Sequence, residues 1–132
     1  MNEIELTNPQ LETVNFRGES SRFNPSGHRN IVVRLSEEDV PKLQEAGLRI
    51  QYLGAEETEP AMKISVNFAN PDISVQMARG IGNIEVNETF VHMLDYVGPL
   101  TIEKLTVCAR PWSHEDRKGV KAFIQQLIVR LP

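Results

Sequence analysis

The chain has 132 residues, and its 14 Lys and Arg against 18 Asp and Glu give a formal net charge of −4. This length suits one domain with a single core, and 40% hydrophobic with 24% charged residues is not the composition of a disordered or fibrous chain. The one cysteine, Cys108, excludes an intrachain disulfide, and no apolar run approaches the roughly 20 residues of a membrane helix. We therefore expect one soluble cytoplasmic domain over residues 1–132 that does not contact a membrane.

The first half of the chain predicts strands and one short helix. We expect residues 1–10 to be a flexible segment. Three strand candidates, at residues 11–17, 30–35 and 48–53, are flanked by turn-forming residues. Apolar residues recur at helical spacing in residues 36–47, which predicts a helix between the second and third strands.

The clearest strand signal lies in the middle of the chain. Met62, Ile64, Val66 and Phe68 alternate with polar or small residues, the period of two expected for a strand with one buried face. A second alternation follows Pro71, which interrupts the first because proline lacks a backbone donor.

The last third of the chain predicts a short helix at residues 87–96 and two strands, at 102–109 and 120–131. Several short strands with a helix before the last two match the order of elements in an oligonucleotide-binding (OB) barrel. We therefore predict a mainly β fold, an OB-like five-stranded barrel with one or two short helices. A mixed sheet with both helices on one face is the alternative.

Charge is unevenly distributed along the chain. Residues 16–34 carry four bases against one acid, and residues 110–121 carry four bases against two acids. Residues 35–61 carry two bases against seven acids. We expect one side of the molecule to be basic and another acidic.

The closing strand predicts a face that is suited to nucleic acid. Lys121, Phe123 and Gln125 alternate with core candidates, so a cation, a ring and an amide share one face. These groups are suited to phosphate attraction and base stacking. The apolar residues after Gln126 fall on the other parity, and a bulge there would return them to the core face. A buried Phe123 is the alternative.

The only tryptophan, Trp112, lies in a polar segment at residues 110–119, which we interpret as a loop. Its ring either stacks on a nucleobase or folds back as a plug over the barrel end. Residues 17–29 form a second loop with arginines, an aromatic residue and flexible glycines. Phe16, which precedes it, is in phase with Val14 and is expected in the core.

The predicted nucleic-acid contacts are seven basic residues that would bind phosphates and three aromatic rings that would stack on nucleobases: Arg17, Arg22, Arg29, Lys63, Arg110, Lys118, Lys121, Phe23, Trp112 and Phe123. We expect no catalytic residue, metal or cofactor. Because one small barrel offers few stacking sites, we expect a homo-oligomer.

Short pieces of the chain resemble small bacteriophage-encoded single-stranded-DNA-binding proteins of the OB type. The pieces include Asn15-Phe16-Arg17-Gly18, Arg110-Pro111-Trp112 and Gly119-Val120-Lys121-Ala122-Phe123-Ile124, and the likeness spans residues 15–129. The resemblance implies a protein of phage DNA replication or recombination that binds single-stranded DNA with little sequence preference. It also implies partners among phage or host replication and recombination proteins, in the cytoplasm of the host cell.

Two other functions compete with this one. A phage interaction or inhibitor protein would bind a host protein through the acidic residues 35–61. A metal-dependent nuclease would use His114, Glu115 and Asp116, but three loop neighbours lack the spacing that lets metal ligands converge.

Overall fold

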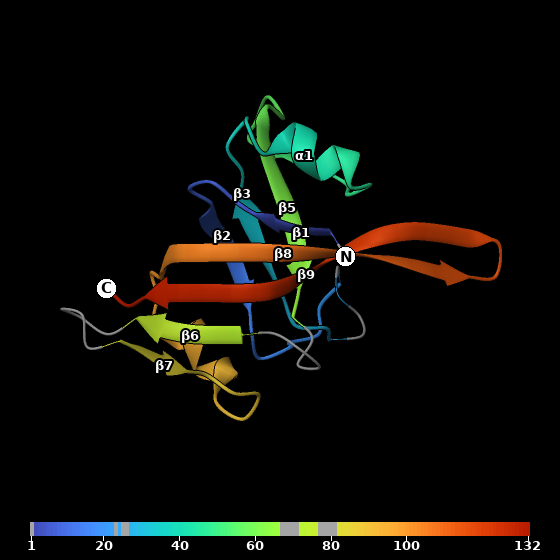
Figure 1. Ribbon diagram of the computed structural model, residues 1–132. Coiled ribbons are helices and arrows are strands. Elements are labelled where there is room, and N and C mark those ends of the chain that lie inside the picture. Colours follow the sequence, from blue (N-terminus) through green and yellow to red (C-terminus); the bar gives the residue numbers. More distant parts are fainter. Residues whose placement is uncertain (1, 23, 25–26, 67–71, 77–81) are drawn as a thin grey trace.

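The computed structural model describes residues 2–22, 24, 27–66, 72–76 and 82–132. In these residues the chain forms nine strands in one curled sheet, a half-barrel with two short helices (Figure 1). The elements in chain order are β1 (Asn2–Glu5), β2 (Gln10–Asn15), β3 (Asn30–Arg34), α1 (Val40–Glu45), β4 (Gln51–Leu53), β5 (Glu59–Ser65), β6 (Asp72–Gln76), β7 (Asn83–Glu85), the 3-10 helix η2 (Val91–Tyr96), β8 (Thr101–His114) and β9 (Arg117–Arg130).

The hairpin of β8 and β9 is the longest feature of the sheet. The two strands have 14 residues each and pair antiparallel from Thr101 and Arg130 to His114 and Arg117. β9 also pairs parallel with β6, and it meets β5 at one pair, Ser65 and Phe123. The strand order is β1-β8-β9-β5-β3-β2, with β4 added to β5 and β7 to β6. The hairpin therefore connects all parts of the sheet.

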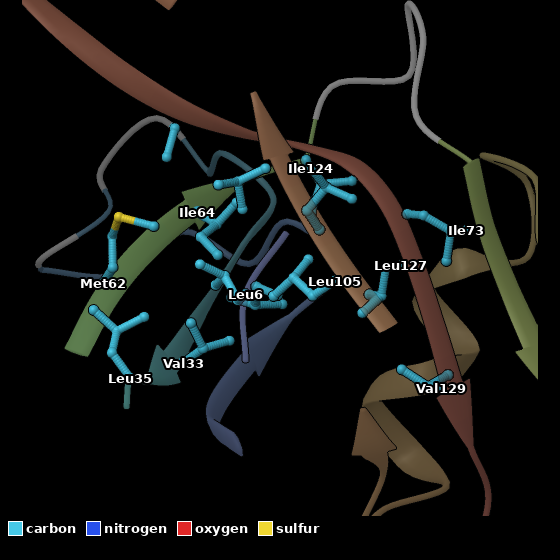
Figure 2. Packing of buried hydrophobic residues seen from close by; sticks show 14 of the residues in the cluster. Leu6, Val33, Leu35, Met62, Ile64, Ile73, Leu105, Ile124, Leu127 and Val129 are labelled. Atoms are coloured by element: carbon cyan, nitrogen blue, oxygen red, sulfur yellow. The ribbon is translucent and has the colours of Figure 1, made fainter. Parts of the chain in front are cut away.

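The alternation predicted for β5 is confirmed for its apolar residues. Met62, Ile64 and Val66 are buried and Lys63 is exposed, but Ser65 is buried as well, and Phe68 lies outside the described residues. The three buried apolar side chains join those of β3, β8 and β9 on the inner face of the curled sheet, where Figure 2 shows buried side chains pointing toward one another. Each fully buried Leu or Ile contributes about 1.5–3 kcal/mol, so this face accounts for much of the driving force for folding.

A bulge in β9 keeps its apolar residues on the core face, as predicted. Thr106 pairs with Gln126 but Val107 pairs with Ile124, which leaves Gln125 without a partner in β8. Ile124 before the bulge and Leu127 after it are both buried. The extra residue thus corrects the change of parity that the sequence shows.

The prediction of five strands is wrong, because the described residues form nine. Two of them, β1 and β7, have only three or four residues each, too few for an alternating pattern to be visible. Strand β4 lies inside the strand predicted at residues 48–53. β5 and β6 do not pair with each other but lie along different stretches of β9. The sheet curls into a half-barrel, and OB topology stays a prediction.

The N-terminal residues differ from the flexible segment predicted for residues 1–10. Strand β1 pairs antiparallel with β8 over four residues, and Leu6 after it is buried in the core. The backbone N–H of Thr7 donates a hydrogen bond of 2.7 Å to the buried carboxylate of Asp39. A paired edge strand and a buried leucine therefore hold this segment.

Both helices are shorter than predicted. In α1 proline occupies the first turn, where its missing N–H costs no hydrogen bond. Before η2, the side chain of Asn87 accepts hydrogen bonds from the N–H groups of Thr89 and Phe90, so a turn takes the place of the expected first helical residues. Among the described residues, neither helix has the length and apolar character needed to cross a membrane.

Candidate nucleic-acid interface

The distal part of the β8–β9 hairpin projects from the rest of the sheet as a two-stranded arm (Figure 1). We call residues 110–121 the arm. The loop predicted for residues 110–119 is wrong, because β8 continues to His114 and β9 begins at Arg117, with Glu115 in the tight turn at a φ of 54°. Most of the arm is exposed, so its sequence lacks the alternation that marks a half-buried strand. Pro111 is tolerated because a two-stranded ribbon leaves one edge of each strand without a partner.

The register of the hairpin brings the predicted contacts to one face. Residues paired across antiparallel strands lie on the same face of a sheet. Arg110 pairs with Lys121 and Trp112 with Gly119, while Phe123 follows Lys121 by two residues. The two cations and two rings therefore lie along one face of the hairpin.

Phe123 is half-buried and has two cations against its ring. The guanidinium carbon of Arg110 lies 5.3 Å from the ring centroid, and Nζ of Lys121 lies 5.5 Å from it. Both distances are within the range of cation–π attraction, which holds the long side chains near the ring. The arrangement places two positive charges beside a partly exposed aromatic surface.

Trp112 lies on the arm with 44% of its surface exposed. Its indole packs against Gly119, since a Cβ at residue 119 would lie 2.9 Å from Nε1 and 3.0 Å from Cε2 and Cζ2. The ring is therefore held in place by the opposite strand and is not a plug in the core. An exposed, fixed indole is suited to stacking on a base.

The first polar loop reaches the base of the arm. Two open recesses flank Lys121: one is lined by His28, Arg49 and Lys63, and the other by Arg29, Phe123 and residues near them. Lys63 joins this face because Ser65, two residues on, pairs with Phe123. Segments far apart in the sequence thus place four cations around one point of β9.

Ion pairing separates the described basic residues, Arg22 apart, into two groups. One group pairs with carboxylates at 4.0 Å or less: Arg17, Arg29, Arg34, Lys42, Lys104 and Arg130. The second group makes no ion pair with any residue that the structure describes, and it comprises Arg49, Lys63, Arg110, Arg117, Lys118 and Lys121. All six lie on the arm or around its base; we call the five other than Lys118, together with Trp112 and Phe123, the basic face. Glu88 also lines the recess beside Lys121, but the ion pair that it forms there is with Arg29.

Six of the ten predicted contacts come together on the basic face or at its edge: Arg29, Lys63, Arg110, Trp112, Lys121 and Phe123. Lys118 is also on the arm, but it pairs with Ser113 and so points to the face opposite Trp112. Arg22 is exposed in the first loop, and Phe23 lies outside the described residues.

Arg17 is in a separate cluster. It forms ion pairs with Glu19 and with Asp95, the latter at 3.7 Å. The hydrogen bond to Glu19 raises the pKa of Arg17 above its ordinary value. Asp95 itself is only 1% exposed and is not the solvated residue that its position on a short helix indicates.

Sequence reasoning missed Arg49. It lies in a segment dominated by acids, and no local signal places it beside Lys63 and Lys121. Arg117 is one of the four basic residues of the segment 110–121, and the hairpin register puts it opposite His114 on the Trp112 face. At the tip His114 and Glu115 lie 4.0 Å apart, and nowhere in the described ranges do three His, Cys, Asp or Glu side chains gather as a metal site requires.

Comparison with known proteins identifies a family for the chain. No curated protein matches the chain. A family model described as "Putative phage ssDNA-binding domain" matches residues 1–131, which includes the whole arm and every residue of the basic face. The match covers nearly the full chain, and the chain belongs to this family of phage single-stranded-DNA-binding domains.

Proposed function

We propose that the protein binds single-stranded DNA with little sequence preference and without catalysis, through the basic face. The observation that carries the proposal is the gathering of five cations without ion-pair partners among the described residues around two partly exposed rings. Cations contact phosphates, which every nucleotide has, and rings stack on any base. Neither kind of contact reads a sequence.

The rings favour a single strand over a duplex. Trp112 and Phe123 present flat surfaces, and the flat surface of a base is accessible only when the base is not stacked inside a helix. The family match supports DNA as the nucleic acid.

The spacing of the rings favours a short binding site. Phe123 pairs with Cys108, which precedes Trp112 by four residues on β8. At about 3.3 Å per residue the rings are roughly 13 Å apart along the strand, or about four nucleotides at the stacked rise of 3.4 Å. Because one copy covers few nucleotides, we infer that several copies coat a strand as a homo-oligomer.

The biological role that fits this activity is phage DNA replication or recombination in the cytoplasm of the host, where single strands become exposed. Proteins of those processes, from the phage or the host, would be the partners. The family match supports a role in phage DNA metabolism of this kind.

The test uses the fluorescence of Trp112 during titration with oligo-dT at several salt concentrations. We expect quenching, and a log–log slope of affinity against salt of about −3.5 if all five cations of the basic face contact phosphates. The same protein should not bind a blunt duplex at the same salt. An affinity that does not change with salt concentration, or the absence of binding in an independent gel assay, would contradict the proposal.

A further inference from the structure

A second combination of arginine and exposed ring lies outside the basic face, at the end of η2. The side chain of Tyr96 is 70% exposed. The guanidinium carbon of Arg17 lies 5.5 Å from the centroid of its ring. An arginine also lies over the ring of Phe123, so the two sites share a cation held beside an aromatic surface.

The backbone of this cluster is firmly anchored. The buried carboxylate of Asp95 accepts hydrogen bonds from the N–H groups of Phe16 at 2.8 Å and Arg17 at 2.9 Å. Phe16 is completely buried, as its phase predicts. The residue next to Tyr96 therefore holds Arg17 in position, and the pair does not depend on a loose loop.

Arg29 connects this cluster to the basic face. Its side chain lines the recess beside Lys121 and Phe123. It also lies against Gly18, where an added Cβ would be 3.2 Å from Cγ of Arg29, and Gly18 directly follows Arg17. Adjacent residues thus form a continuous surface of cations and rings from Phe123 to Tyr96.

The arginines of this second segment already form ion pairs with carboxylates. Arg29 pairs with Glu88 at 3.4 Å, and Arg17 pairs with Glu19. Both glutamates are exposed, so each is free to move away when a phosphate takes its place. On the arm, no described carboxylate is paired with a lysine or arginine, so none competes with a phosphate there. A strand would therefore bind to the arm first and to this segment second.

We propose that a strand bound on the basic face continues over Arg29 to Tyr96, which stacks a further base while phosphates replace Glu88 at Arg29 and Glu19 at Arg17, whose buried partner Asp95 stays in place. The inference rests on the proposed function and adds a second position to that binding surface. Only a strand long enough to span both segments would use it.

The experiment compares oligo-dT of about 4 and about 16 nucleotides, the limits of typical site sizes. We expect Tyr96→Ala to weaken binding of the longer strand about 5- to 100-fold and to bind the shorter strand like the unchanged protein. Tyr96→Phe should bind the longer strand like the unchanged protein because it keeps the ring. Glu19→Gln, which removes the charge of the exposed partner of Arg17, should strengthen binding of the longer strand only. Tyr52→Ala, an exposed tyrosine on β4, serves as the control and should bind both strands normally.

The outcomes separate the two proposals. If Tyr96→Ala binds both lengths normally, or weakens both equally, the second position is overturned while the proposed function stands. A change in self-association with unchanged DNA binding would likewise overturn it and assign the ring to a protein contact. If the unchanged protein binds neither strand, the proposed function fails and this inference fails with it.

Discussion

Arg110 and Lys121 face each other across the β8–β9 hairpin, and both approach the ring of Phe123. Like charges directly opposite in a sheet are destabilising, by a few tenths to about 1 kcal/mol. Cation–π attraction to Phe123 offsets part of this cost, and a bound phosphate would offset the rest. The retention of this unfavourable charge pair on an exposed face indicates an anion-binding site.

Replacing Lys121 tests this relationship directly. We expect Lys121→Ala to weaken binding of oligo-dT and to reduce the salt slope by about 0.7, the contribution of one phosphate contact. The free energy of unfolding should stay equal or rise slightly, because a repulsion is removed. Titrations at several salt concentrations and urea denaturation measure the two effects. The control is Lys104→Ala, a base at the other end of the hairpin that pairs with Glu5. Similar losses in both variants would contradict a localised site.

Trp112 should contribute to binding but little to stability. Its ring is half exposed on the arm and lies outside the core. We expect Trp112→Ala to lose about 1–3 kcal/mol of binding free energy, the value of one stacked base. Fluorescence anisotropy of a labelled oligonucleotide measures this without the native tryptophan. A large fall in unfolding free energy would instead show that the ring supports the fold.

Gly119 controls the position of that ring. Because a Cβ would lie 2.9 Å from Nε1 of Trp112, Gly119→Ala must displace the indole. We expect a change in tryptophan emission in the free protein and weaker binding to oligo-dT. The control is Ser113→Ala, which changes a residue of the arm but leaves Gly119, the residue paired with Trp112, unchanged. Gly82→Ala is not a suitable control, because Gly82 has a φ of 102° and alanine would be strained there. Normal emission and binding in Gly119→Ala would contradict the packing described for the indole.

Asp95 should matter for stability far more than an exposed acid. Removing its carboxylate leaves the N–H groups of Phe16 and Arg17 without acceptors, and Phe16 is fully buried. We expect Asp95→Ala to cost about 1–3 kcal/mol of unfolding free energy, and Asp95→Asn, which keeps one acceptor oxygen, to cost less. Urea denaturation measures both. Asp116→Asn, at the exposed tip of the arm, should leave stability unchanged. An equal effect at both positions would contradict the anchoring role.

Local pattern predicted those parts of the fold that burial controls. The strands at β2, β3, β5 and β6, the buried Phe16 and the bulge in β9 were all visible in the sequence, because a half-buried strand must alternate and a change of parity must be corrected. The sequence also showed that bases and rings occur together near Trp112.

The arm and the short edge strands were not visible in this way. A ribbon exposed on both faces carries no alternation, and strands as short as β1 and β7 are too short to show one. Strand β4 was predicted, at residues 48–53, but it is shorter than the prediction. The same limitation applies to Asp95, whose role depends on two N–H groups 78 and 79 residues away in the chain.

By itself, then, the sequence determined a mainly β domain, the inward faces of its longer strands and the residue types of a nucleic-acid interface, because these follow from neighbours along the chain. Only the tertiary structure decided that Arg29, Arg49 and Lys63 meet Lys121, and that Trp112 lies on a projecting arm. The physical reason is that these contacts come from the pairing of β3 and β4 with β5, and of β5 and β8 with β9. Strand pairing is set by packing of the whole core, which no local stretch of residues specifies.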